Sequence, residues 1–532
     1  MDEPFAAVDA QTRAEPEDLA VPGRRGEGRP VSPGGRHSTI ERGFVVDFLD
    51  PKVWSGSVFG GNGWEPSRAG DAPVIAPATG HEIGRAGVAG PADVTAASAQ
   101  AAKAQREWAA ASFEERAGVL RRAGRLFEEH AADIQGWLIR ESGSIPGKAG
   151  FETYVAAQEC YEAAALASQP PGEILPTAKK RLSLARRVPV GVVGVISPFN
   201  APLILGIRSV APALALGNAV VFKPDPRTAV CGGVAVARVF EEAGLPAGLL
   251  HMLPGGAETG EAMVADPRIR VISFTGSTAA GRKVGELAAR HLKRVHLELG
   301  GNSALIVLDD ADLDLAVSAG AWGSFFHQGQ ICMTAGRHLV HSSIKDEYVE
   351  RLAAKADHMP VGDPATQEVA LGPLIDERQR DKVHALVTGS LDSGARLAAG
   401  GTYEGLFYRP TVLTDLTPSA PAYAEEVFGP VAPVMGFSSP EEAASLAADS
   451  EYGLSLGILT GDAMKGLALA DLIPSGIVHI NDQTVDDEAV APFGGVGASG
   501  TGSRFGGTRA NIEAFTDTQW VTMQGDIARY PF

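Results

Sequence analysis

One cysteine of the 532-residue chain, Cys332, lies among residues that suit a reactive thiol. Its neighbours are small or polar, and they include Gln328, Gly329, Gln330 and Thr334. A thiol attacks as the thiolate, which needs a locally positive and partly open setting. Backbone N–H groups left free in this segment would supply such a setting. The alternative is that Cys332 is a small buried apolar residue, because free cysteines often are.

Two polar residues upstream could act together with this thiol. Glu298 lies at the carboxyl end of an apolar run, Val-His-Leu-Glu-Leu at 295–299. Burial there would raise the pKa of the carboxyl group towards the range of a general base, and a buried salt bridge is the alternative. Asn200 ends the run Ser-Pro-Phe-Asn at 197–200. Its amide could donate to a developing oxyanion, or it could cap the helix that follows.

Other residues suggest a nucleotide site. The run 274–281, which contains Gly276 and Gly281, lies where a strand becomes a helix, and a helix N-terminus favours a pyrophosphate. An ordinary glycine turn is the alternative. Lys223 ends a strand and could hold a ribose hydroxyl or a phosphate, or be a solvated lysine. The run Gly-Val-Gly-Ala-Ser-Gly at 495–500 fits the dinucleotide pattern more strictly, but more glycine follows it, so we assign it no nucleotide.

Strand-like and helix-like segments alternate after residue 190 and would position these groups. Continuous apolar strands separated by amphipathic helices predict a parallel sheet covered on both faces, with ligands beyond the carboxyl ends of its strands. A second α/β pattern follows from 304 to about 510, so the predicted fold class is α/β. The expected strands of the first set are 192–197, 219–222, 249–253, 271–274 and 295–299, and the expected helices are 201–216, 228–243, 259–265 and 278–291.

Length, charge and cysteine content limit the classes of function. The length predicts two or three domains, and no apolar run is long enough to span a membrane. A net charge of −18 argues against nonspecific nucleic-acid binding. Cys160, Cys231 and Cys332 are too far apart for a disulfide framework or a metal site, and free thiols predict a cytoplasmic protein. Residues 1–40, rich in Pro, Gly and charge, are predicted to be a disordered extension.

Seven short runs of sequence resemble those of the aldehyde dehydrogenase superfamily in their order and spacing, over residues 45–525. The segments 197–228, 326–330 and 479–485 look most like bacterial benzaldehyde dehydrogenases, which act on aromatic aldehydes. The seven runs are Ser-Pro-Phe-Asn at 197–200, Phe-Lys-Pro at 222–224, Phe-Thr-Gly-Ser at 274–277, Leu-Glu-Leu-Gly-Gly at 297–301, Gly-Gln-Ile-Cys at 329–332, Glu-Glu-Val-Phe-Gly-Pro at 425–430 and Pro-Phe-Gly-Gly at 492–495.

The resemblance implies a domain plan. A Rossmann-like NAD(P)-binding domain would comprise 41–169 and 189–300, and a second α/β domain, 301–508, would carry the catalytic cysteine. A small β oligomerisation element would comprise 170–188 and 509–532. The expected assembly is a homodimer or a homotetramer.

The resemblance also implies the NAD(P)-dependent oxidation of an aldehyde, aromatic by the finer likeness, to its acid through a thiohemiacetal and a thioester. Cys332 would attack, Asn200 would stabilise the oxyanion, and Glu298 would activate the hydrolytic water. The implied cofactor residues are Ser197, Phe199, Lys223, Asp225, Pro226, Gly276, Ser277, Gly281, Leu299, Gly300, Glu426 and Phe428. The implied substrate residues are Ala201, Leu205, Arg208, Ile331, Met333, Val485 and Phe493.

Two departures leave alternatives open. Pro226 stands where NAD-using relatives commonly carry a ribose-binding glutamate, with Asp225 beside it, so both NAD and NADP remain candidates. Arg208 could bind a substrate carboxylate, as in a semialdehyde dehydrogenase, or pair with an acidic neighbour. Acyl transfer to coenzyme A is disfavoured by Glu298, and a catalytically silent cofactor-binding relative is disfavoured by the presence of Cys332, Glu298 and Asn200 together.

Overall fold

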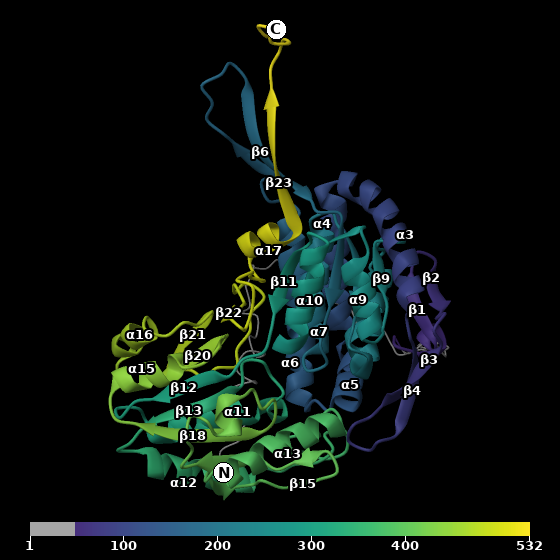
Figure 1. Cartoon of the computed structure of the whole chain (residues 1–532). Coiled ribbons are helices and arrows are strands. Elements are labelled where there is room, and N and C mark those ends of the chain that lie inside the picture. Colours follow the sequence, from purple (N-terminus) through teal and green to yellow (C-terminus); the bar gives the residue numbers. More distant parts are fainter. Residues whose placement is uncertain (1–47) are drawn as a thin grey trace, which may run out of the picture. The chain divides into compact units, whose positions relative to one another are not determined.

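The computed structural model describes residues 48–532, so the extension expected at 1–40 lies outside the described residues. Two seven-stranded sheets, each with helices packed around it, dominate this part of the chain (Figure 1). In the part described, no helix combines the length and the apolar content needed to cross a membrane.

The first sheet carries the strands predicted after residue 190. Five of its strands, from the edge strand β11 to β9, are parallel, because helices connect them, and β1 and β2 extend the sheet beyond β9 in antiparallel pairing. The pairs Thr275 with Glu298 and Ile196 with Lys223 place the carboxyl ends of four strands at one edge. The order is β11 (Arg294–Glu298), β10 (Ile269–Thr275), β7 (Val192–Ile196), β8 (Ala219–Lys223), β9 (Leu250–Met252), β1 (Ser57–Gly60) and β2 (Gly63–Pro66).

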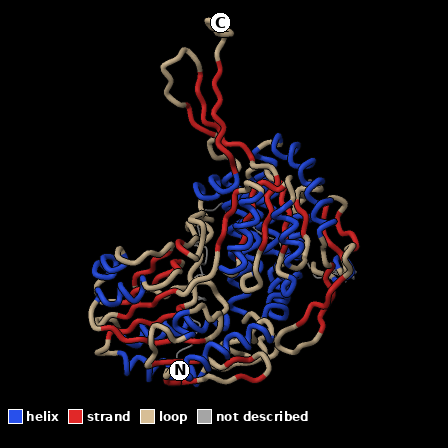
Figure 2. The backbone as a smooth tube through the Cα atoms, viewed as in Figure 1, coloured by secondary structure: helices blue, strands red, loops and turns tan. Residues whose placement is uncertain are grey.

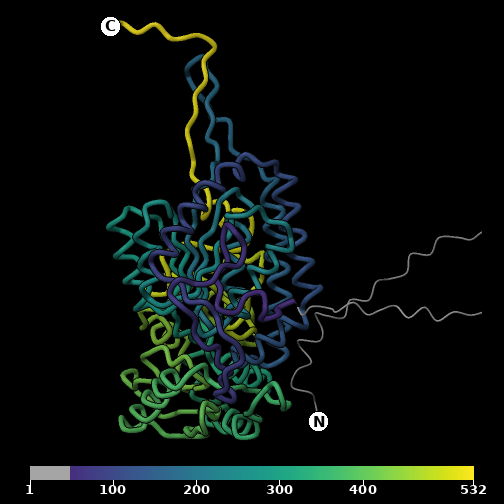
Figure 3. The backbone as a smooth tube through the Cα atoms, turned by 90° about the vertical axis from the view of Figure 1, so that its right-hand side faces the viewer, coloured from purple at the N-terminus to yellow at the C-terminus, as the bar shows by residue number. Residues whose placement is uncertain are grey.

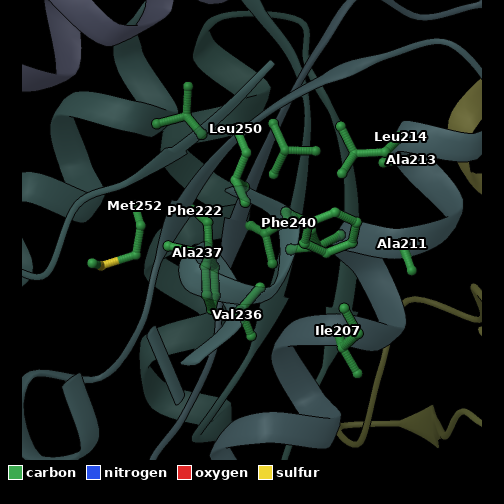
Figure 4. Packing of buried hydrophobic residues seen from close by; sticks show 14 of the residues in the cluster. Ile207, Ala211, Ala213, Leu214, Phe222, Val236, Ala237, Phe240, Leu250 and Met252 are labelled. Carbon is green, nitrogen blue, oxygen red and sulfur yellow. The ribbon is translucent and has the colours of Figure 1, made fainter. Parts of the chain in front are cut away.

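Two groups of helices cover this sheet. One group consists of α3 (Pro91–Ala110), α9 (Ala257–Ala265) and α10 (Thr278–Arg290). The other consists of α4 (Phe113–Glu129), α5 (Ala131–Ser142), α6 (Pro146–Leu166), α7 (Pro202–Ala215) and α8 (Ala235–Glu242). Between α7, α8 and the sheet, the buried side chains of Ile207, Phe222, Phe240 and Leu250 belong to one apolar core (Figure 4).

The helix expected at 228–243 differs in its first half. A 3₁₀ turn (Pro226–Thr228) and a π-helix (Val230–Val234) precede α8. The buried carboxylate of Glu141 accepts hydrogen bonds from the N–H groups of Val230 (2.9 Å) and Cys231 (2.6 Å). A Cβ atom on Gly232 would lie 2.7 Å from that of Pro202. The local sequence therefore predicts an ordinary helix, and contacts with α5 and α7 impose the irregular one.

The second sheet follows directly, because β12 begins five residues after Glu298. Its helices are α11 (Leu313–Phe325), α12 (Lys345–His358), α13 (Glu377–Asp392), α15 (Pro440–Ala448) and α16 (Ala463–Ala470). The strand order is β14 (Arg396–Ala399), β17 (Thr411–Thr414), β18 (Val431–Phe437), β13 (Ala335–His341), β12 (Ser303–Val307), β20 (Ser455–Leu459) and β21 (Ile477–Ile480). His338, on β13, bonds to Ser324 and Tyr348 in a buried network.

A three-stranded sheet projects from the first part of the fold (Figure 2). It pairs β5 (Gly172–Ile174) and β6 (Leu182–Pro189) with β23 (Thr516–Met523), which follows α17 (Thr508–Phe515). These strands lie within the segments 170–188 and 509–532 that the resemblance assigned to one small β element, and β6 and β23 lie side by side in both views (Figure 3). Trp520 and Met523 expose apolar surface on it.

We expect replacement of Phe240 by Ala to destabilise the chain. The ring is fully buried in the core of the first sheet, so its removal should cost about 3–5 kcal/mol in free energy of unfolding. Denaturant unfolding followed by tryptophan fluorescence measures this cost. The matched control is Leu292→Ala, because Leu292 is 96% exposed and should change stability by less than about 0.5 kcal/mol. Equal midpoints for the two variants would contradict the packing described.

Candidate active site

Cys332 lies between α11 and β13, just after a short turn (Phe326–Gly329). His327 (φ 49°) and Gln328 (φ 55°) adopt left-handed backbone conformations, which are unusual for side chains of their size. Gly329 (φ 65°) is required, because a Cβ atom there would lie 2.1 Å from the carbonyl oxygen of Gly429. The cysteine therefore follows a segment whose conformation is held by tertiary contacts.

Side-chain amides fix this segment from both sides. Gln328 Nε2 donates to the carbonyl oxygens of Gly143 (3.1 Å) and Pro373 (2.7 Å). Gln330 Oε1 accepts from the N–H of Ile375 (3.1 Å). The sequence identified both glutamines only as polar neighbours of the thiol. Their role as tethers was missed, because their partners lie far away in the chain.

Glu298 ends β11 as predicted, and its side chain is only 3% exposed. Neither carboxyl oxygen has a hydrogen-bond partner of ordinary geometry, and within residues 48–532 the group forms no ion pair. Burial raises the pKa of Glu298 to about 8, against the opposing effects of Arg208, Arg504 and the nearby backbone N–H of Gly495. Of the two roles considered, the buried salt bridge does not form, and the carboxyl group is free for proton transfer.

The thiol lies close to this carboxyl group because the chain between the two sheets passes next to it. A Cβ atom on Gly301 would lie 2.5 Å from the carbonyl oxygen of Cys332. Glu426 Oε1 accepts from the N–H of Gly301 (3.0 Å). Burial, followed by the charges of Glu426 and Glu298, raises the pKa of Cys332 to about 12. The thiol is therefore within the electrostatic influence of both carboxyl groups, next to the close contact of Gly301 with Cys332.

The cysteines differ in exposure as a reactive and two structural thiols should. Cys160 and Cys231 are fully buried, and burial raises the pKa of each thiol well above its usual value. Cys332 is only partly buried. It is therefore the thiol that a small molecule can reach most easily.

Asn200 lies in the turn between β7 and α7, four residues after the strand ends. The N-cap of α7 is Ala201, so the alternative capping role of Asn200 is not what the structure shows. The Asn200 carbonyl oxygen accepts from Lys148 Nζ (2.6 Å). Its side-chain amide forms no hydrogen bond with any residue that the structure describes. This buried amide can therefore donate to a bound group.

Arg208, on α7, is almost completely buried and pairs with Asp487 and, at 3.6 Å, with Glu159. The structure thus shows the acidic neighbours that the sequence allowed as an alternative to a substrate carboxylate. The Arg208 guanidinium also stacks 4.5 Å from the centre of the Phe493 ring. Leu205 is buried on the same helix, and Ala201 precedes it.

Four of the seven expected substrate residues pack with the thiol. Met333 and Phe493 are buried in a small apolar cluster, with Ile331, Val485 and Cys332 partly buried against it. An apolar and aromatic wall next to a nucleophile suits a flat apolar substrate.

The groups expected to hold a cofactor include buried polar atoms without partners. Lys223 ends β8, is 7% exposed, and its ammonium has no hydrogen bond or ion pair with the described residues. The buried Ser197 hydroxyl also lacks a partner, and the Ser197 N–H donates to the Lys223 carbonyl (3.1 Å). Unpaired buried donors at the carboxyl edge of a parallel sheet fit a ligand rich in hydroxyl or phosphate oxygens.

The turn before α10 is bonded to the backbone of Glu298. The Gly276 N–H donates to the Glu298 carbonyl (3.1 Å), and Ser277 caps α10 by accepting from the N–H of Ala280 (3.3 Å). Gly281 packs on Leu299, since a Cβ atom there would lie 2.3 Å from Leu299 Cδ2. Both of these residues line a groove of about 540 Å³ beside α10. Gly300 lies against Glu426 Oε2, 2.4 Å from where a Cβ atom would stand.

An arginine that the sequence analysis missed bridges the two parts of the fold. Arg227 donates to both oxygens of Asp225 (2.9 Å each) and to Asp376 Oδ2 (2.7 Å). The other oxygen of Asp376 caps α13. It also stacks 4.1 Å from the centre of the Phe199 ring. Pro226 is the first residue of the 3₁₀ turn that Asp225 caps. The Asp225 carboxylate is therefore engaged within the protein.

The structure also shows where Phe428 and the glycine run at 495–500 lie. Phe428 (φ 56°) meets Phe199 edge to face, with ring centres 5.9 Å apart, so these two expected cofactor residues are neighbours. The glycine run at 495–500 contains the short strand β22 (Val496–Gly497) and does not open a helix, as the sequence analysis expected.

Comparisons with known proteins agree with this geometry. The family model "Aldehyde dehydrogenase family" matches residues 64–521. A vanillin dehydrogenase of Amycolatopsis sp. is 72% identical over 92% of this chain and 100% of its own length. A benzaldehyde dehydrogenase [NAD(+)] of Pseudomonas putida is 51% identical over 90% of this chain and 98% of its own.

Solved structures lead to the same family. A salicylaldehyde dehydrogenase from Pseudomonas putida G7, complexed with salicylaldehyde, superposes with a TM-score of 0.86 at 36% identity, covering 90% of this chain and 99% of that one. A betaine aldehyde dehydrogenase from Staphylococcus aureus in complex with NAD+ gives a TM-score of 0.87 at 29% identity, covering 93% and 98%. The resemblance found in the sequence is confirmed, and this chain belongs to the aldehyde dehydrogenase family.

Proposed function

We propose that this chain oxidises aromatic aldehydes to carboxylic acids with NAD(P). The observation that carries the proposal is that the partly buried thiol of Cys332 packs with an apolar and aromatic cluster and is acted on by the charge of the buried Glu298 carboxyl group. A nucleophile and a general base with a free oxygen are the two groups that acyl formation and hydrolysis require.

The names of the relatives support the aromatic class. Relatives that cover most of the chain are called vanillin, benzaldehyde and salicylaldehyde dehydrogenases. Each of these three substrates is a benzene ring that carries one aldehyde group. A flat ring suits the wall formed by Met333, Phe493, Ile331 and Val485.

The residues act in two stages. The Cys332 thiolate adds to the aldehyde carbon, and the carbonyl electron pair moves to the oxygen, where the Asn200 amide and the Cys332 N–H donate hydrogen bonds. Bound NAD(P) supplies a hydride acceptor. Loss of hydride from the carbon restores the carbonyl group as a thioester on Cys332. Glu298 then takes a proton from water, the water oxygen adds to the thioester carbon, and the carbon–sulfur bond breaks to release the acid and the thiolate.

We infer that Lys223 and Glu426 would hold the two riboses of the cofactor. The Gly276–Ser277 turn would bind its pyrophosphate, and Phe199 and Phe428 would contact its nicotinamide end. Both Asp225 oxygens bond to Arg227, so a 2′-phosphate would meet a paired rather than a free carboxylate. Pro226 offers no carboxylate to a ribose. We therefore expect NAD to be used and NADP to be accepted.

The semialdehyde alternative has weaker support. A carboxylate clamp needs an available guanidinium, and Arg208 is already paired with Asp487 and Glu159. A substrate carboxylate would be the third negative group around one buried cation. We therefore propose that Arg208 stacks on the Phe493 ring and does not bind a substrate carboxylate.

Two proposals concern the setting of the enzyme. The exposed apolar side chains of β6 and β23, among them Leu182, Trp520 and Met523, support pairing with a second copy of the chain, as a homodimer or a homotetramer. The need to keep Cys332 reduced supports a cytoplasmic location. The domain roles follow the site: the first sheet would bind the cofactor and the second would carry the nucleophile.

We expect Cys332→Ala to abolish aldehyde oxidation while leaving NAD binding intact. Glu298→Gln should release one equivalent of reduced cofactor per site and then turn over about 10²–10⁴-fold more slowly, because the hydrolytic water then has no base to accept its proton. Stopped-flow absorbance of the reduced nicotinamide measures both phases. Steady turnover of the glutamine variant at the parent rate would remove Glu298 from its assigned step.

An aldehyde panel tests the substrate class. Because the wall beside Cys332 is apolar and Arg208 is paired, kcat/KM should be at least about tenfold higher for benzaldehyde and vanillin than for succinic semialdehyde. The same panel with NAD and with NADP measures cofactor use. A preference for succinic semialdehyde would contradict the pairing of Arg208 and favour the clamp.

The pH dependence of alkylation tests the electrostatics of the thiol. Because the pKa of Cys332 lies near 12 without ligands, the thiolate fraction and the rate with iodoacetamide should rise about tenfold per pH unit from about pH 7 to about pH 10. Glu426→Gln removes a negative charge and should speed alkylation at neutral pH. Cys332→Ala is the control, since Cys160 and Cys231 are fully buried. A plateau near pH 8 in the parent would show that these charges do not act on the thiol.

A further inference from the structure

A buried lysine touches the turn that carries Asn200 and takes no part in the proposed steps. Lys148 lies in the first turn of α6 and is 3% exposed. Its Nζ donates to the Asn200 carbonyl oxygen at 2.6 Å, and it also bonds to Glu152, one turn further along the helix. The ammonium group is therefore held against the Asn200 carbonyl oxygen by two hydrogen bonds.

Glu152 holds the other end of the same turn. Its Oε2 accepts from the N–H of Leu203 (3.1 Å), in the first turn of α7, and its side chain is fully buried. One turn of α6 thus forms hydrogen bonds with the carbonyl group of residue 200 and the N–H group of residue 203. The N-cap residue between them, Ala201, has no side chain that can cap α7. The hydrogen bonds of Lys148 and Glu152 take the place of that cap.

The segment that leads to Cys332 meets this pair. The imidazole of His327 is buried, and its pKa is lowered well below the usual value, first by burial and then by the charge of Lys148, while the Asn200 carbonyl opposes the shift. His327 is therefore neutral next to an ammonium group. The loop that leads to Cys332 is also bonded just before α6, because Gln328 Nε2 donates to the Gly143 carbonyl oxygen (3.1 Å).

We propose that Lys148 is a positioning residue for aldehyde oxidation, because its ammonium fixes the Asn200 peptide so that the side-chain amide meets the oxyanion formed on Cys332. The inference rests on the proposed function. In the described chain the Asn200 amide has no hydrogen bond of its own, so its position depends on its backbone. An error of about 1 Å in such a group can cost about 10²-fold in rate.

The energetics of the ion pair favour this explanation. A buried ion pair is often no more stabilising than apolar residues of the same volume, because both charges lose their hydration. A pair that served only stability would be replaceable at little cost. Its contact with the two ends of the Asn200 turn gives it a geometric role.

The test uses the full chain with the Glu298→Gln change, in which a single turnover of reduced cofactor is observed. Lys148→Met is combined with Glu152→Gln, so that no unpaired carboxylate stays buried. Lys148→Arg keeps a donor. Lys293→Met is the matched control, because Lys293 also donates to a backbone carbonyl, that of Asp266, between α10 and β11.

The burst has a rate and an amplitude, and they separate positioning from folding. With vanillin and NAD we expect the Lys148→Met/Glu152→Gln variant to keep the amplitude and lose about 10–100-fold in rate. Lys148→Arg should recover most of that rate, and Lys293→Met should match the parent. A fall in amplitude at an unchanged rate would mean that fewer sites are folded, and it would overturn the proposal.

A double-mutant cycle tests the route through Asn200. If Lys148 acts by placing the Asn200 amide, Lys148→Met/Glu152→Gln should lose almost nothing further when Asn200 is already Ala. Additive losses would overturn the proposal while leaving the dehydrogenase function intact. If the Glu298→Gln protein without further changes gave no burst with vanillin, benzaldehyde or salicylaldehyde, both the proposed function and this inference would be overturned.

Discussion

A close backbone contact between Gly301 and Cys332 brings the two halves of the site together. Glu298 ends the last strand of the first sheet, and the second sheet begins at Ser303, so the connection between them is only four residues long. Within it, Gly301 leaves no room for a side chain against the Cys332 carbonyl, and its N–H bonds to Glu426. A short connection that contacts the loop of Cys332 fixes Glu298 and the thiol in the same region of the fold.

The same contact creates an electrostatic problem. Glu298, Glu426 and a thiolate would be three negative groups acting on one another, and Arg208 is a cation whose effect opposes the shift on the thiol. Burial and mutual repulsion therefore favour the protonated forms of both the thiol and the Glu298 carboxyl group. Arg208 is itself shared with Asp487 and Glu159, so its charge is only partly available. The thiol is thus held in its less reactive, protonated form, and the side chains packed against it are apolar.

The features that the sequence predicted are the local ones. The apolar runs before Glu298 and Lys223 predict buried strands, and the parallel arrangement follows from the helices between them, so both side chains were expected at one edge of a sheet. The features that it did not predict depend on distant partners. The π-helix at Val230–Val234 depends on Glu141, the bridge of Arg227 depends on Asp376, and the tethers of Gln328 depend on Gly143 and Pro373. None of these contacts changes the periodicity of the sequence around it. The pairing of Arg208 was open for the same reason, since its acidic partners are 49 residues before it and 279 residues after it in the chain.

We propose that Cys332 carries an acyl group until Glu298 activates the water that removes it. Mass spectrometry of the Glu298→Gln protein, quenched in acid after mixing with vanillin and NAD, tests this step. We expect the peptide that contains Cys332 to gain the mass of one vanilloyl group, in the same amount as the reduced cofactor formed. Reduced cofactor without an acyl group on that peptide, or with the acyl group on Cys160 or Cys231, would contradict it.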